Sequence, residues 1–296
     1  MLRAIGFLMF LLSVPANAET VAVETFAGRI VAPVLPDRIA VFDLAALDSL
    51  TALGVQPFGL ISRVYLPYLE DAAVGTVPVG SLFEPDFEAV FAMSPDLIIA
   101  GGRSSEQVPE LARIAPTLDM TIWGNTVEEG LARLAAYGQI FDKQAEAESL
   151  ITDFNNKLSK VRAAVSGSGR ALIVMTNGPK ISAYGAGGRF GWLHDALELP
   201  EAVESVEKAT HGEAISFEFI REANPDILFV IDRIAAIGQD SESASATLDN
   251  VLVHETTAWK TGQVIHLSAG PIYLAGGGIQ SMTLTLDEIL AGLKDR

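Results

Sequence analysis

The sequence predicts an α/β protein built from two similar lobes that one long helix joins. The first observation is a pattern that occurs twice, 130 residues apart: Glu88 to Arg103 and Glu218 to Arg233 share a Glu, a Pro-Asp pair and an Arg at matching offsets. Each copy is typical of a short helix that Pro-Asp ends, followed by a buried strand whose far end carries the arginine. The second observation is the apolar stripe of Gln144–Val165, whose spacings of three and four residues predict a single long helix between the copies. Two similar halves that each present a charge at a strand end predict two lobes facing one cleft.

The first residues are typical of a secretory signal. An arginine at position 3 precedes an apolar run from Ala4 to Val14, and Ala16-Asn17-Ala18 has the small-x-small form of a signal-peptidase site. We therefore expect residues 1–18 to be removed on export. The alternative is an uncleaved membrane anchor, but the run is shorter than the about 20 apolar residues that span a bilayer. The chain has no cysteine to carry the lipid of a bacterial lipoprotein, so we expect a soluble periplasmic protein.

Length and composition agree with two domains. A chain of 296 residues with 49% hydrophobic residues can bury two cores, and we expect a first lobe at 19–143, a connecting helix at 144–166 and a second lobe at 167–296. The formal net charge is −17, which repels nucleic acid and anionic membranes. No basic run of five or more residues is present, so we expect no nucleic-acid partner.

The elements of the first half alternate between strands and helices. Val21–Thr25 and Arg29–Ala32 predict a hairpin, and Arg38–Phe42 predicts the strand that follows it. Asp43 is placed to cap the helix Leu44–Leu53, which Gly54 ends in a left-handed conformation. The other elements expected before the long helix are the strand Pro57–Ile61, the first copy of the repeat, and the helices Gln107–Ile114 and Val127–Phe141.

The second half repeats this alternation after a break at Ser166–Gly169, the flexible segment that follows the long helix. A turn at Asn177-Gly178-Pro179 separates its first two strands. The expected elements are the strands Arg170–Met175 and Ile181–Tyr184, the helix Phe190–Leu197, the second copy of the repeat, the helix Ser245–Leu252, the strand Val264–Leu267 and the helix Gly278–Leu293.

Five side chains with binding chemistry are expected in loops at strand or helix ends: Arg103, Arg189, His211, Arg233 and Tyr273. Taken singly, each has an ordinary structural explanation, such as a surface ion pair, a solvated histidine or a structural tyrosine. Taken together, they suit one ligand. Guanidinium groups recognise anionic, planar, oxygen-rich molecules, while phenolate and imidazole are good ligands for ferric iron. The set therefore predicts a receptor for an anionic ferric complex.

Other chemistries find little support in the sequence. Gly185, Gly187 and Gly191 lack the spacing of a dinucleotide-binding loop and follow a hairpin strand, so a loop that lets Arg189 approach a ligand is the better interpretation. The four histidines form neither the helical pair nor the dense cluster of a zinc site. A secreted hydrolase is the alternative from another class, but no G-x-S-x-G, H-E-x-x-H or cysteine nucleophile is present.

At these residues the sequence resembles the periplasmic substrate-binding proteins of iron–siderophore ABC transporters, in particular the branch that binds ferric catecholate siderophores. The most specific motifs are THGxxxxxEFI, GxxxRFGxxHD and the Tyr-Leu-Ala that begins at Tyr273. The resemblance covers nearly all of the chain after residue 18. The stretches that carry it are Arg38–Gly54, Glu88–Arg103, Ser182–Leu197, Thr210–Arg233 and Ile272–Met282.

The resemblance implies a class III periplasmic binding protein: two Rossmann-like lobes joined by one long backbone helix, with limited closure on the ligand. It implies that Arg103, Arg189 and Arg233 contact the anionic catecholates. His211 and Tyr273 would complete the iron coordination when a siderophore supplies only four donor atoms. Iron(III) would arrive inside the siderophore complex, and the protein would carry no cofactor of its own.

The resemblance also implies a second binding surface. Glu88 and Glu218 match the glutamates that dock each lobe on arginines of the permease, although a solvated acid in a first helical turn is the plain alternative. The protein would act as a monomer that hands ferric siderophore to an inner-membrane importer and catalyses no reaction. Two departures are the missing lipoprotein cysteine and the run Gly276–Gly278, which we expect to reshape the pocket beside Tyr273. A receptor for haem, cobalamin or a metal ion on the same fold remains the alternative.

Overall fold

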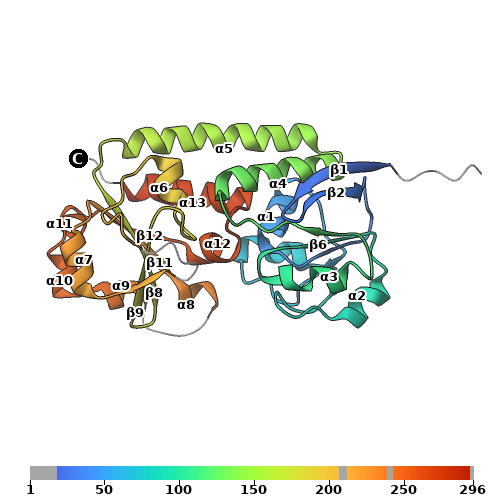
Figure 1. Ribbon diagram of the computed structural model, residues 1–296, viewed down its shortest axis with the longest axis horizontal. Coiled ribbons are helices and arrows are strands. Elements are labelled where there is room, and N and C mark those ends of the chain that lie inside the picture. Colours follow the sequence, from blue (N-terminus) through green and yellow to red (C-terminus); the bar gives the residue numbers. More distant parts are fainter. Residues whose placement is uncertain (1–18, 207–211, 239–242, 294–296) are drawn as a thin grey trace, which may run out of the picture.

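Two five-stranded sheets, each flanked by helices, lie side by side beneath the long helix α5 (Gln144–Val165) in a computed structural model (Figure 1). The structure describes residues 19–206, 212–238 and 243–293. Helix α5 has the range that its apolar stripe predicts, and its buried side chains are members of that stripe. The first sheet belongs to residues before α5 and the second to residues after it, so α5 spans the two halves.

The first sheet is parallel throughout, in the order β5-β4-β3-β6-β7. Its central strands are buried along their whole length, as parallel strands covered by helices on both faces must be. The hairpin that the sequence predicts is present: β1 (Thr20–Thr25) and β2 (Gly28–Pro33) pair antiparallel, separate from the sheet. It packs beside helix α4 (Thr126–Ile140). The sheet strands are β3 (Ile39–Val41), β4 (Gly59–Leu60), β5 (Val77–Pro78), β6 (Leu97–Ala100) and β7 (Thr117–Asp119).

The second sheet is mixed, in the order β10-β9-β8-β11-β12. Strands β8, β11 and β12 are parallel, whereas β9 runs antiparallel to both β8 and β10. Strand β10 was not predicted from the sequence, because a three-residue strand at a sheet edge has too little periodicity to detect. The strands are β8 (Ala171–Asn177), β9 (Lys180–Tyr184), β10 (Glu213–Ile215), β11 (Ile227–Asp232) and β12 (Val264–Leu267).

The helices lie around the two sheets (Figure 1). In the first half they are α1 (Leu44–Ala52), η1 (Pro67–Ala73), α2 (Phe87–Met93), η2 (Gly102–Gln107), α3 (Val108–Leu111) and α4 (Thr126–Ile140). In the second half they are α6 (Trp192–Leu197), α7 (Phe217–Ala223), α8 (Arg233–Ala236), α9 (Ala244–Leu248), α10 (Val251–His254), α11 (Thr257–Thr261), α12 (Ala269–Leu274) and α13 (Ile279–Gly292).

Local capping explains where several helices begin. Asp43 caps α1 as predicted, its carboxylate accepting from the Ala46 N–H at 2.7 Å, and Gly54 follows the helix in the left-handed region at φ 73°. The single helix predicted at Ser245–Leu252 is wrong. The chain forms two short helices there, because the Asn250 side chain accepts from the Leu252 N–H at 2.9 Å and starts a new helix, α10.

The repeated pattern forms the same structural unit in both lobes. Helices α2 and α7 each have seven residues and begin at a side-chain cap, Asp86 in one and Ser216 in the other. Each ends at a left-handed residue directly before the proline, Ser94 in one and Asn224 in the other. The prediction of a short helix, a Pro-Asp stop and a buried strand is confirmed for both copies.

The aspartate of each Pro-Asp pair ties the unit to the neighbouring central strand. The Asp96 carboxylate accepts from the Arg38 N–H at 2.9 Å, just before β3. The Asp226 carboxylate accepts from the Arg170 N–H at 2.8 Å, just before β8. Each aspartate therefore fixes the start of the strand that pairs with its own, which is why the repeat includes the acid as well as the proline.

The last helix, α13, is held to the first lobe by a buried carboxylate. Asp48 of α1 accepts from the Gln280 N–H at 2.7 Å and the Ser281 N–H at 2.9 Å, and from the Tyr68 hydroxyl at 2.7 Å. A Cβ on Gly278 would lie 2.6 Å from an Asp48 oxygen, so only glycine fits before this helix. Burial raises the pKa of Asp48 to about 7, although the three hydrogen bonds oppose that rise.

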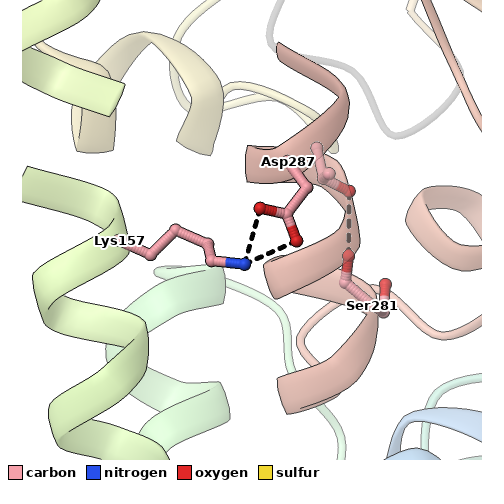
Figure 2. Close-up of polar contacts among 4 residues, drawn as sticks. Lys157, Ser281 and Asp287 are labelled. Carbon is pink, nitrogen blue, oxygen red and sulfur yellow. Dashed lines mark hydrogen bonds and ion pairs between the residues drawn. The ribbon is translucent and has the colours of Figure 1, made fainter. Parts of the chain in front are cut away.

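Helix α13 also contacts the connecting helix. Figure 2 shows Lys157 of α5 reaching across to both carboxylate oxygens of Asp287, with 2.6 Å between Nζ and Oδ1. The same helix packs against β12 of the second sheet. Two helices, α5 and α13, thus link the lobes, which favours limited rather than wide relative movement. Among the described residues, no helix is both long and apolar enough to cross a membrane.

Candidate ligand-binding site

The structure brings four of the five predicted side chains together, with three arginines around Tyr273. Arg189 donates to the Tyr273 carbonyl oxygen at 2.8 Å, and Arg103 donates to the same oxygen at 3.1 Å. Arg233 donates from Nε to the Tyr273 hydroxyl at 3.2 Å. The guanidinium carbons of Arg189, Arg103 and Arg233 lie 4.2, 5.2 and 5.9 Å from the centre of the tyrosine ring. Three cations from both halves of the chain therefore surround one phenol.

The elements that position these side chains explain why they converge. Arg103 lies in η2, directly after β6, and Arg233 is the first residue of α8, directly after β11. Carboxyl ends of parallel strands are the usual place for ligand sites in open α/β sheets. Arg103, Arg233 and Tyr273 were all expected in loops, and that expectation is wrong: each lies in a short helical segment, Tyr273 in α12. Pro271 does not prevent this helix, because residues in a first turn need no intrahelical N–H partner.

The electrostatics of the cluster disfavours the positive charges of its own arginines and favours the phenolate form of Tyr273. Burial, followed by the charge of Arg103, holds the pKa of Arg189 below its usual value. Burial alone would raise the pKa of Tyr273, but the Arg233 hydrogen bond and the three positive charges outweigh it, so this pKa lies below that of an ordinary tyrosine. An anion at this position would relieve the repulsion between the guanidinium groups.

A second tyrosine nearby behaves in the opposite way. Burial raises the pKa of Tyr184 to about 12, although the charges of Arg189 and Arg233 oppose the rise. Its ring meets Phe190 edge to face at 4.7 Å between centroids, and Phe190 lies 6.5 Å from the Tyr273 ring. These aromatic rings form an apolar wall behind the charged groups.

Asn177 belongs to the cluster as well, although the sequence did not predict it there. Its Oδ1 accepts from Nη1 of Arg233 at 3.2 Å, which orients the guanidinium from the end of β8. The residue was noted only as the start of a turn. Its place at the carboxyl end of a strand was the available indication, because β8 pairs directly with β11, the strand that precedes Arg233.

The remaining predicted residues lie elsewhere. His211 lies outside the residues that the structure describes. Glu88 and Glu218 occupy the first turns of α2 and α7, where both are exposed, and these helices lie at opposite ends of the molecule (Figure 1). The structure therefore does not bring the glutamates to the arginine cluster, in keeping with the separate surface expected for them.

The glycine run beside Tyr273 serves close packing between the lobes. Gly277 has φ 92°, and a Cβ there would meet the Ile122 side chain at 2.5 Å. A Cβ on Gly130 of α4 would lie 2.4 Å from the Gly277 carbonyl oxygen. The run thus lets the chain between α12 and α13 pass directly against the first lobe, next to the cluster.

A cavity of about 340 Å³ lies on the α5 side of the lobe junction. None of the four clustered side chains lines it, but Gly188, the neighbour of Arg189, does. Trp123, on the first lobe, is 68% exposed and directly precedes the cavity residue Gly124. The Glu129 carboxylate accepts backbone N–H groups from Trp123 at 2.8 Å and from Gly124 at 2.9 Å, so this loop is well fixed.

The arrangement suits recognition of a flat, negatively charged ligand. Each guanidinium carries five N–H donors, and each arginine uses one of them toward Tyr273. Arg103 uses another toward the Leu274 carbonyl oxygen, and Arg233 uses another toward Asn177. Further donors can therefore bind oxygen anions, while the tyrosine offers a phenolate oxygen to a hard cation. Within the described part of the chain, no group of three or more His, Cys, Asp or Glu residues gathers as a metal site would.

The fold is that of a two-lobed protein whose halves one long helix joins, with the candidate site where the lobes meet. This is the architecture of class III periplasmic binding proteins. A family model described as periplasmic binding protein matches residues 39–270, and the chain therefore belongs to that family.

Curated relatives and solved structures agree with this membership. The petrobactin-binding protein YclQ of Bacillus subtilis is 36% identical over 267 residues, covering 88% of this chain and 84% of that protein. The ferric-anguibactin-binding protein FatB of Vibrio anguillarum is 31% identical over 281 residues, covering 92% and 87%. The crystal structure of YclQ superposes with a TM-score of 0.87 at 34% identity, covering 94% of this chain and 100% of that one. The periplasmic catecholate-siderophore binding protein VctP of Vibrio cholerae superposes with a TM-score of 0.86 at 29% identity, covering 92% and 100%.

Proposed function

We propose that this protein binds a ferric siderophore of the catecholate type in the periplasm and delivers it to an inner-membrane ABC importer. The observation that carries the proposal is the convergence of Arg103, Arg189 and Arg233 on Tyr273. Ferric catecholates are anionic, planar and rich in oxygen, which matches the donors of these guanidinium groups. Relatives whose names specify petrobactin, ferric anguibactin and a catecholate siderophore support the same ligand class.

In this proposal the three arginines bind the catecholate oxygens and Tyr273 coordinates iron(III). The lowered pKa of Tyr273 favours this role, because less free energy is needed to ionise the phenol. His211 supplies the second protein ligand when a siderophore offers four donor atoms. The iron is cargo, and it leaves the protein in the same complex in which it arrived, without a catalysed reaction.

We further propose that residues 1–18 direct export and are removed, so that the mature protein acts as a soluble monomer. Glu88 and Glu218 would then contact arginines of the importer, one from each lobe. Their exposure on the first turns of α2 and α7 supports this role, because nothing nearby has to move for a partner to reach them.

A binding screen tests the proposed ligand class. The probes are ferric complexes of a bis-catecholate, a tris-catecholate and a hydroxamate, together with haemin and cobalamin. The readouts are quenching of tryptophan emission, to which the exposed Trp123 contributes, and the ferric charge-transfer band in visible absorption. We expect the bis-catecholate to change both.

Variants separate the roles of the site residues. Tyr273→Phe should shift the charge-transfer band, because it removes a ligand of the iron. Arg189→Gln should weaken binding by about tenfold or more, since a charge-assisted hydrogen bond contributes about 1.5–3 kcal/mol. Arg113→Gln is the matched control, because this arginine is exposed and pairs with Glu110 on the surface. If haemin or cobalamin binds while the ferric catecholates change neither readout, the siderophore proposal is wrong.

A further inference from the structure

The two helices that carry the exposed glutamates present different surfaces. In the repeat, Glu88 corresponds to Glu218, and Phe91 corresponds to Arg221 three residues later. Phe91 is 72% exposed on α2. Arg221 on α7 lies 3.8 Å from Glu222 in a surface ion pair. The two lobes thus share an acid, but place an apolar ring beside it on one side and a guanidinium on the other.

The aromatic surface of the first lobe is larger than one ring. Phe87 lies one helical turn before Phe91, on the same face of α2, and is 38% exposed. Phe83, in the turn before the helix, is 58% exposed. In the second lobe, by contrast, Phe217 and Phe219 of α7 pack against the core of the second sheet. The first lobe therefore exposes an aromatic face, defined by Phe83, Phe87 and Phe91, that has no equivalent on α7.

The charges around this face indicate its occupant. The glutamates at 84 and 88 are exposed beside the phenylalanines, in a protein of net charge −17. Acids next to an apolar face disfavour binding to an anionic membrane. They also disfavour symmetric contact with a second copy of the chain, which would bring like charges together. They favour a protein surface with an apolar socket bordered by cations, where large aromatic side chains are typical anchors.

We propose that the aromatic face on α2 docks in such a socket on one half of the importer, whereas α7 docks through charge on the other half. The protein then seats in one orientation only. This inference rests on the docking role of Glu88 and Glu218 proposed above, and adds that the two docking contacts are not interchangeable.

Exchange of the side chains between the lobes tests the inference. Phe91→Arg gives α2 the residue that α7 has, and Arg221→Phe does the reverse. Phe91→Leu keeps the surface apolar, and Val31→Arg is the matched control, because Val31 is 62% exposed on β2, away from both helices. The first measurement is the affinity for the ferric bis-catecholate. The second is uptake of radiolabelled iron from this complex by cells of the source organism in which the chromosomal gene is deleted and the variant is expressed. The third is the mass of the protein in solution.

We expect Phe91→Arg to bind the bis-catecholate within about twofold of wild type and to lower uptake at least tenfold, with Phe91→Leu and Val31→Arg close to wild type. Arg221→Phe should lower uptake as well, since it places an apolar ring against the half of the importer that α7 contacts through charge. Wild-type uptake by Phe91→Arg overturns the inference. A lower mass in solution for Phe91→Arg than for the wild-type protein also overturns it, because this result would identify a second copy as the partner of the aromatic face.

The failure of the proposed function has a different signature. If no ferric catecholate binds the wild-type protein, both proposals fail together. If binding is normal and charge reversal at Glu88 and Glu218 lowers uptake while Phe91→Arg does not, only the directional docking is wrong.

Discussion

Asp48→Asn should change how the stability of the protein depends on pH. Burial raises the pKa of Asp48 from its ordinary 3.8 to about 7, and its side chain is fully buried. A carboxyl group whose pKa is raised by folding binds its proton more tightly in the folded state. Its contribution to stability is therefore complete below the ordinary pKa and is lost as the pH rises through about 7.

The size of the effect follows from the two pKa values. Each pH unit between them corresponds to about 1.36 kcal/mol, so the full range corresponds to roughly 4 kcal/mol. Roughly 2.5 kcal/mol of this falls between about pH 5 and about pH 8. The Asn variant cannot ionise, so the free energy of unfolding of wild type minus that of Asp48→Asn should fall by this amount over the interval.

Urea denaturation followed by circular dichroism at several pH values measures this difference. Asp86→Asn is the matched control, because it removes the same charge from the exposed start of α2, where asparagine caps a helix as well as aspartate does. If wild type and Asp48→Asn lose stability in parallel over the interval, Asp48 stays ionised on its three hydrogen-bond donors. That result would show that burial does not raise the pKa of this carboxyl group.

Two further expectations concern the site and the repeat. In an ultraviolet titration, Tyr273 should ionise at lower pH than Tyr184, because arginine charges lower the first pKa whereas burial raises the second to about 12; Tyr273→Phe should abolish the early phase and Arg233→Gln should move it to higher pH. An early phase that persists in Tyr273→Phe would contradict this assignment. Asp96→Ala should destabilise the protein by about 1–2 kcal/mol in urea denaturation, because it leaves the N–H groups before β3 without their carboxylate acceptor. An unchanged urea midpoint would show that water replaces the carboxylate at no cost.

The sequence predicted those parts of the fold that depend on neighbours along the chain. The Asp43 cap, the stripe of α5 and the repeated helix-and-strand unit were all correct, because capping and periodicity are local properties. The convergence of arginines from both halves was also expected, since strand ends in a two-lobed protein face a common cleft.

The contacts that the sequence could not predict are those between distant residues. Asp48 was placed only within a helix, because nothing local distinguishes an acid that binds Gln280 and Ser281 from one that faces water. Asn177 was read as a turn residue for the same reason. Tyr273 was misplaced because Gly270 and Pro271 before it and the glycine run after it indicated a loop, whereas packing favoured a short helix.

The attachment of α13 to the first lobe has a consequence for biogenesis. The buried carboxylate of Asp48 finds its backbone partners 232 and 233 residues later in the chain, and Met282 and Leu286 of α13 belong to the core cluster that also contains first-lobe residues. A nascent chain therefore cannot complete its first lobe until translation has nearly finished. Contacts this distant in sequence also slow folding. Until α13 has been made, the first lobe exposes apolar surface that the finished protein buries against this helix.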